Sequence, residues 1–176
     1  EQYYRDIRIT PIYEGTTAIH GLDLLGRKVT MANGDAVKAL AKEIMETINE
    51  ATAFDDLKPY AGVLGKELES LNKTLMHLLG VAQTGDTERY LSDASLFLEL
   101  TGNVVIAWQW LAIGVATKNS VDKIDSNFAI SKIETMKFYY HYELPRNLGL
   151  HKRLCDETVI TLLKDQDIFN FCKNIF

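Results

Sequence analysis

The segment from Ile12 to Thr16 combines residue types that suit a ligand site. Its sequence is Ile-Tyr-Glu-Gly-Thr, so the carboxylate of Glu14 and the glycine Gly15 directly precede a predicted helix that begins at Thr16 or Thr17. A connector ahead of a helix can present a side chain to a cleft, and a glycine lets the backbone approach a ligand closely. A carboxylate there can act as a general base if burial raises its pKa. Without further context, however, a solvated loop carboxylate is the more common state of such a residue.

Other residue types that carry chemistry do not form a recognisable pattern. The sequence has four histidines and two cysteines, namely His20, His77, His141, His151, Cys155 and Cys172. Their spacing matches no metal site and no local Cys-His or Ser-His-Asp arrangement. No glycine-rich phosphate loop is present. We therefore predict that His77 is a partly buried structural residue and that Cys155 is a packing residue rather than a nucleophile.

Apolar residues recur at helical spacing along most of the chain, and no segment alternates with the period of a strand. The predicted helices cover residues 1–9, 16–29, 35–48, 57–78, 90–117, 128–143 and 150–163. Because the connections are short, consecutive helices should lie antiparallel. We predict an all-α fold, an up-and-down bundle of four or five helices preceded by two shorter ones. Residues 1–32 are expected to end one helical domain and residues 33–176 to form a further bundle domain.

Several helix boundaries follow from local signals. Thr16 or Thr17, Asp35 and Asp86 are predicted N-caps, and Pro145 should end the helix before it. The apolar face of residues 16–29 should include Ile19, Leu22, Leu25 and Val29. The uncharged run from Leu100 to Thr117 reaches the length of a short membrane span, but it has polar residues and two tryptophans in mid-run. We expect a buried core helix and no membrane span.

The amino-acid composition and net charge limit the classes of protein to which this chain can belong. The chain has 176 residues, of which 47% are hydrophobic and 24% are charged, as in ordinary globular domains. The formal net charge of −5 argues against a nucleic-acid-binding protein, because such proteins carry basic surfaces. With two cysteines and no secretion signal, a reducing cytoplasmic location is expected. The chain starts without Met in apparently structured sequence, so we expect it to be a piece of a longer protein.

Two stretches resemble the acyl-CoA dehydrogenases. Residues 4–29, with the sequence YRDIRITPIYEGTTAIHGLDLLGRKV, are similar to the segment that carries the catalytic base in medium-chain-type members. Residues 132–146, with the sequence KIETMKFYYHYELPR, are more weakly similar to a helix of the extra C-terminal domain in the long branch. That branch includes 3-methylmercaptopropionyl-CoA dehydrogenase. The resemblance therefore implies a C-terminal portion of such an enzyme.

The resemblance assigns roles to four residues. Glu14 would abstract the α-proton of an acyl-CoA thioester while hydride passes to FAD, and its backbone N–H would stabilise the developing enolate. Thr16 would contact FAD, and Tyr13 and Gly15 would line the substrate site. The partners implied are acyl-CoA, electron-transfer flavoprotein and a second subunit of a homodimer. The intact parent would act in fatty acid metabolism, whereas this fragment alone should be inactive.

Two positions depart from the family pattern. Ala18 and His20 stand where glutamine is common, which leaves the details of the FAD contact open. Two other functions also remain open from the sequence. One is a non-catalytic helical assembly module, against which the retained Glu14 argues. The other is an acyl-CoA oxidase, which would use the same base but pass electrons to oxygen.

Overall fold

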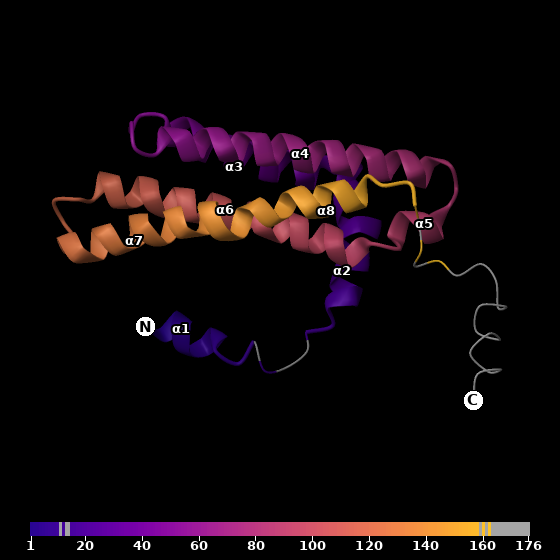
Figure 1. Cartoon of the computed structure of the whole chain (residues 1–176), viewed down its shortest axis with the longest axis horizontal. Coiled ribbons are helices and arrows are strands. Elements are labelled where there is room, and N and C mark those ends of the chain that lie inside the picture. The colour runs from indigo at the N-terminus through magenta and orange to yellow at the C-terminus, as the bar shows by residue number, and fades with distance from the viewer. Residues whose placement is uncertain (11, 13–14, 159, 161, 163–176) are drawn as a thin grey trace.

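The structure, a computed structural model, describes all residues except 11, 13–14, 159, 161 and 163–176 (Figure 1). The described residues form helices and turns and contain no strand, which confirms the all-α prediction. The elements are, in order, α1 (Gln2–Ile7), α2 (Thr17–Gly26), η1 (Lys28–Gly34), α3 (Asp35–Ala51), α4 (Lys58–Gln83), α5 (Thr87–Leu91), α6 (Ala94–Asn119), α7 (Ser126–Phe138), η2 (Tyr139–Glu143), η3 (Leu144–Arg146) and α8 (Asn147–Leu154).

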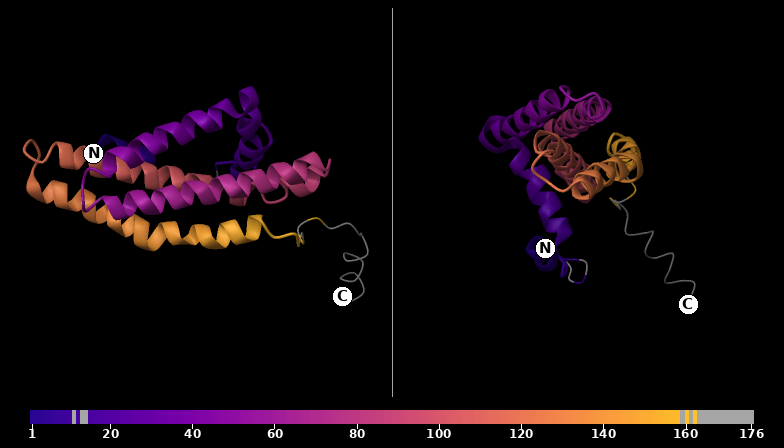
Figure 2. Two further views of the ribbon diagram at one scale, coloured as in Figure 1. Left: turned by 90° about the horizontal axis from the view of Figure 1, so that it is seen from above. Right: turned by 90° about the vertical axis from the view of Figure 1, so that its left-hand side faces the viewer.

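The long helices form the predicted up-and-down bundle. Helices α3, α4 and α6 and the rod formed by α7 and α8 lie side by side with alternating direction (Figures 1 and 2). Helix α6 is central, because it contacts α2, α3, α4, α7 and α8. Helix α2 packs against α6 at its C-terminal end, and the chain toward α1 extends away from the bundle at one side, as the end-on view in Figure 2 shows.

The core is built from apolar residues at the helical spacing that the sequence shows. On α4, Leu64, Leu71, Leu75 and Leu78 are buried at helical spacing, and Pro59 lies in its first turn. On α6 the fully buried residues include Phe97, Leu100, Val104, Ala107 and Leu111, which face α3, α4 and α7 across one continuous core. Burial of these side chains, rather than helix propensity, supplies most of the stability of such a bundle.

Helix α6 is long and apolar enough to cross a membrane by length and composition, the single such helix among the described residues. A core helix can pass the same test. In the bundle, α6 contacts α2, α3, α4, α7 and α8, and the Trp108 indole N–H donates to the Thr47 hydroxyl at 2.7 Å. The two sides of α6 differ, since Ile106 and Ile113 remain exposed.

The connection between α2 and α3 differs from the prediction. Helix α2 ends at Gly26 rather than near Val29, and Val29 is buried in the 3-10 segment η1 instead. Asp35 is not the N-cap of α3: Gly34 occupies that position with φ 81°, and Asp35 is the first helical residue. The chain must reverse direction here, and the left-handed backbone at Ala32, Asn33 and Gly34 makes that turn.

The predicted helix 90–117 is divided in two. Asp86 caps α5, as predicted, by accepting the Arg89 N–H at 3.1 Å. A break at Ser92–Asp93 then separates α5 from α6. At the other end of α6, Asp125 caps α7 by accepting the Phe128 N–H at 3.0 Å.

The expected end of a helix before Pro145 is wrong. Helix α7 continues through the π-helical turn η2 and the 3-10 turn η3 into α8, so the chain forms one bent rod (Figure 1). Pro145 lies in the first turn of η3, where its missing N–H is not required. The predicted last helix was also misplaced, because α8 begins at Asn147 and ends at Leu154. Most of the apolar tail, including Cys172, lies outside the described residues.

A buried polar network joins this rod to α4 and α6. Asn147 is 2% exposed, and its amide accepts a hydrogen bond from Asn103 at 2.9 Å and donates one to Glu67 at 2.8 Å. Nearby, Tyr139 donates to the carbonyl of Asn103 and Tyr140 to that of Ala107, at 3.2 and 3.0 Å. These bonds satisfy polar groups in the core and thereby favour one register of the rod on α6.

We predict that the bundle loses stability in alkaline solution because of these two tyrosines. Burial, with the Glu143 carboxylate second, raises the pKa of Tyr139 from 10.0 to about 12, and burial also raises the pKa of Tyr140. In the unfolded chain both tyrosine hydroxyls ionise near pH 10, whereas in the folded protein they stay neutral at that pH. The stability they provide is therefore present below pH 10 and is lost as the pH rises from 10 to about 12.

Urea unfolding at several pH values across this range measures the effect. The Tyr140→Phe variant should show a smaller loss of unfolding free energy with rising pH than the native chain. Tyr3→Phe, at a tyrosine that is 91% exposed, provides the control and should leave the pH dependence unchanged. Parallel pH profiles for the native chain and Tyr140→Phe would contradict the assignment.

Candidate functional site

The candidate site from the sequence lies at the entrance to α2. Tyr13 and Glu14, the predicted substrate contact and catalytic base, lie outside the described residues. Gly15 and Thr16 are described, and both are exposed. A Cβ atom at Gly15 would have no atom within 4 Å, so the space beside this residue is open. Their assigned roles in binding stay predictions.

Thr16 does not cap α2 in the way the sequence suggested. It is the N-cap residue, but its backbone is left-handed with φ 56°, and its hydroxyl donates to the Gly15 carbonyl at 2.6 Å. A left-handed non-glycine residue is uncommon and concentrates where the chain turns sharply. The first turn of α2 holds no acidic residue, so its N-terminal N–H groups can attract an anion.

The C-terminal half of α2 is held against the start of α6. Gly21 is buried, and a Cβ atom built on it would lie 2.8 Å from the Ala94 carbonyl oxygen. Only a glycine allows this approach of two helix backbones. One turn later, Leu25 is fully buried, and its carbonyl accepts a hydrogen bond from the buried Tyr90 hydroxyl. The end of α2 that leads to the bundle is therefore fixed in place.

The remaining surface of α2 is open. Ile19 and Leu22, predicted on the buried face, are 64% and 44% exposed, because that face does not contact the bundle. Ala18 and His20, the two positions that depart from the family pattern, are exposed as well. Helix α1 also has no buried residue. The apolar side chains of both helices thus form an open surface around the candidate site.

An ion pair lies at the end of α2. The Arg27 guanidinium donates to the Asp23 carboxylate at 2.5 Å across one helical turn. This hydrogen bond lowers the pKa of Asp23 and raises that of Arg27. The pair joins the last turn of α2 to Arg27, the residue that follows the helix. Since the Arg27 side chain is 69% exposed, solvent screens the pair and it contributes little to stability.

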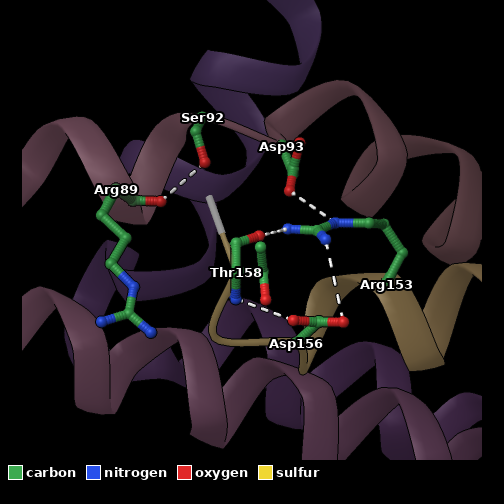
Figure 3. A network of polar contacts seen from close by, with 6 residues as sticks. All are labelled: Arg89, Ser92, Asp93, Arg153, Asp156 and Thr158. Atoms are coloured by element: carbon green, nitrogen blue, oxygen red, sulfur yellow. Dashed lines mark hydrogen bonds and ion pairs between the residues drawn. The ribbon is translucent and has the colours of Figure 1, made fainter. Parts of the chain in front are cut away.

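A second polar network, which sequence reasoning missed, braces the junction of α5 and α6 on which α2 rests (Figure 3). Arg153 of α8 donates to Asp93 at 3.3 Å and to the Thr158 carbonyl, and it lies 3.9 Å from Asp156. The backbone N–H of Thr158 lowers the pKa of Asp156. Because the partners are distant in sequence from Asp93, no local signal could have revealed this network.

Among the described residues, the histidines and Cys155 do not form a recognisable catalytic arrangement. His77 is half-buried, as expected for a structural histidine. The Nδ1 atom of His151 bonds to the buried Thr74 hydroxyl at 2.5 Å, and the Cys155 sulfur lies 4.0 Å from the same nitrogen. Thr74 thus holds the nitrogen that Cys155 would need as its base. Within the described ranges, no group of His, Cys, Asp or Glu could hold a metal ion.

Comparison with known proteins gives one family and several relatives. The family described as Acetyl-CoA dehydrogenase C-terminal like matches residues 40–162, which cover most of the bundle. The chain is 35% identical over 157 residues to 3-methylmercaptopropionyl-CoA dehydrogenase of Ruegeria pomeroyi, which covers 88% of this chain and 26% of that protein.

Two further relatives are more distant. The broad-specificity linear acyl-CoA dehydrogenase FadE5 of Mycobacterium tuberculosis is 29% identical over 82% of this chain and 25% of its own length. The butyryl-CoA dehydrogenase of Syntrophomonas wolfei is 23% identical over 85% of this chain and 25% of its own length. The chain therefore spans about a quarter of the length of the curated relatives that it matches.

We predict that Gly21→Ala weakens the contact between α2 and α6. The added methyl group would meet the Ala94 backbone, so one helix must move, which costs about 1–3 kcal/mol of unfolding free energy. Gly62→Ala is the matched control, because a Cβ atom at this helical glycine meets nothing within 4 Å. That change should stabilise the chain by about 0.5–1 kcal/mol. Urea unfolding compares the two, and equal effects would disprove the close contact.

Proposed function

Because this chain belongs to the acyl-CoA dehydrogenase C-terminal-like family, we propose that it forms the C-terminal part of an FAD-dependent acyl-CoA dehydrogenase. The observation that carries the proposal is the family match over residues 40–162, joined to a Tyr13–Thr16 segment that directly precedes α2. The relatives named above are acyl-CoA dehydrogenases, which supports the same reaction class for the intact parent.

In this proposal Glu14 is the catalytic base. The α-proton of an acyl thioester is weakly acidic, so a carboxylate can remove it only when water is excluded and the pKa of the carboxylate rises toward neutrality. The backbone N–H of Glu14 would donate to the thioester carbonyl and stabilise the negative charge that develops there. Tyr13 and Gly15 would line the pocket for the acyl chain.

FAD would supply the acceptor for the hydride that leaves the β-carbon. The described residues fit one edge of such a cofactor. The N-terminus of α2 carries no acidic residue in its first turn and can face an anionic group, and the exposed Thr16 hydroxyl lies beside it. They cannot enclose a dinucleotide by themselves. The parent would supply the other contacts, pass its electrons to electron-transfer flavoprotein and assemble as a homodimer in the cytoplasm.

The test uses the full-length parent, loaded with flavin, in the absence of oxygen. A panel of 3-methylmercaptopropionyl-CoA, butyryl-CoA and longer linear acyl-CoAs should include one class that bleaches the flavin absorbance. Glu14→Gln should slow this bleaching by roughly 100- to 10,000-fold, because it removes the general base. Glu43→Gln, at an exposed carboxylate of α3, should leave the rate unchanged.

The outcomes separate the competing functions. A flavin-loaded parent that is reduced by an acyl-CoA but reoxidised rapidly by oxygen would instead be an oxidase. A parent that binds no flavin would favour a helical assembly module without catalysis. Equal bleaching rates for the native protein and Glu14→Gln would disprove the role of Glu14.

We also predict that the isolated chain retains no stoichiometric FAD and has no dehydrogenase activity. The reason is that its described residues offer one helix N-terminus and one hydroxyl to the cofactor. Gel filtration after incubation with FAD, followed by the flavin absorbance of the protein peak, measures this directly. A one-to-one flavin content would contradict the prediction.

A further inference from the structure

The bundle contains an apolar cavity of about 380 Å³ between α3, α4, α6 and the segment from α2 to η1. Its innermost lining residues, such as Ile44, Leu71, Phe97 and Val104, are buried core residues. Helix α3 diverges from α4 toward η1, as Figure 2 shows, and the cavity lies on this side of the bundle. Because four elements surround it, the space is a pocket rather than a groove along one helix pair.

We propose that this cavity binds one medium-length alkyl chain, the apolar tail of a fatty acid or fatty acyl group. Its volume lies in the range of small-molecule sites, roughly 300–1,000 Å³. In other proteins an apolar cavity of about 150 Å³ stays dry and binds benzene. At the same volume per carbon atom, this cavity accommodates roughly ten to fifteen carbon atoms. It is too small for an α-helix, whose diameter with side chains is about 10–12 Å.

The polar groups of the lining favour a ligand with one polar end. Among the lining residues the polar ones are Glu69, Asn72 and Thr101. The Thr101 hydroxyl donates to the Phe97 carbonyl of its own helix, so its proton does not need an acceptor on the ligand. Glu69 and Asn72 are exposed and mark the mouth between α3 and α4, where Glu69 also pairs with Lys73 at 2.7 Å. An alkyl chain can thus enter while its polar end stays in water at this mouth.

Gly65 contributes to the open space of the cavity. It lies within α4 on the cavity wall, and a Cβ atom there would meet nothing within 4 Å. Its backbone is not left-handed, and no neighbouring backbone comes close. A glycine inside a helix lowers stability, and neither turn geometry nor close packing requires one here. The missing side chain instead leaves the cavity open.

This inference is independent of the proposed function, because it requires neither flavin nor catalysis. Decanoic acid is the probe, and isothermal titration calorimetry with the 176-residue chain should show saturable one-to-one binding. Coenzyme A without an acyl group should not bind, because it lacks the apolar chain. Gly65→Leu places a side chain in the cavity and should weaken the binding of decanoate at least tenfold.

Gly62→Leu is the matched control, since it makes the same change on the same helix but away from the cavity. It should leave the affinity unchanged. Methyl NMR spectra should also place decanoate next to Ile44 and Leu71. The proposal is overturned if the native chain does not bind decanoate, if both variants bind it as the native chain does, or if the shifted methyl signals lie elsewhere in the bundle.

Discussion

The close backbone contact between α2 and α6 determines how the N-terminal segment relates to the bundle. Gly21 brings α2 directly against the Ala94 backbone, and the Tyr90 hydroxyl bonds to the carbonyl of the buried Leu25. Helix α6 in turn contacts α3, α4, α7 and α8. The position of α2, and with it the residue Thr16 at its start, therefore depends on packing that is distributed over the whole bundle rather than on the short N-terminal helices themselves.

The bundle combines an apolar seam with a few buried polar bonds that fix its register. An apolar seam alone permits neighbouring helices to slide by a turn, because leucines three or four residues apart are nearly equivalent. The Asn103–Asn147–Glu67 network and the Tyr139 and Tyr140 hydroxyls remove that freedom, since a shifted rod would leave these groups without partners. The π-helical turn at Tyr139–Glu143 places both tyrosines against α6 while the rod continues past Pro145.

Close packing is not uniform along the molecule. Near Gly21 the helices approach as closely as backbones allow, whereas α3 diverges from α4 and leaves the cavity beside Gly65. Both glycines lie within helices, yet they have opposite consequences: one permits contact and the other leaves space. The exposed apolar face of α2 is a third region, one in which the described residues provide no covering layer.

The helical class, the antiparallel order, the helical spacing of the apolar residues and the Asp86 cap could be predicted from the sequence, because each rests on spacing within one helix or one turn. It also singled out residues 12–16 through a family resemblance, although Tyr13 and Glu14 lie outside the described residues. The close approach at Gly21, the continuous rod through Pro145, the Arg153 network and the cavity are visible only in the folded chain. Each of these depends on partners tens of residues apart, and the energy of such contacts has no local signature in the chain.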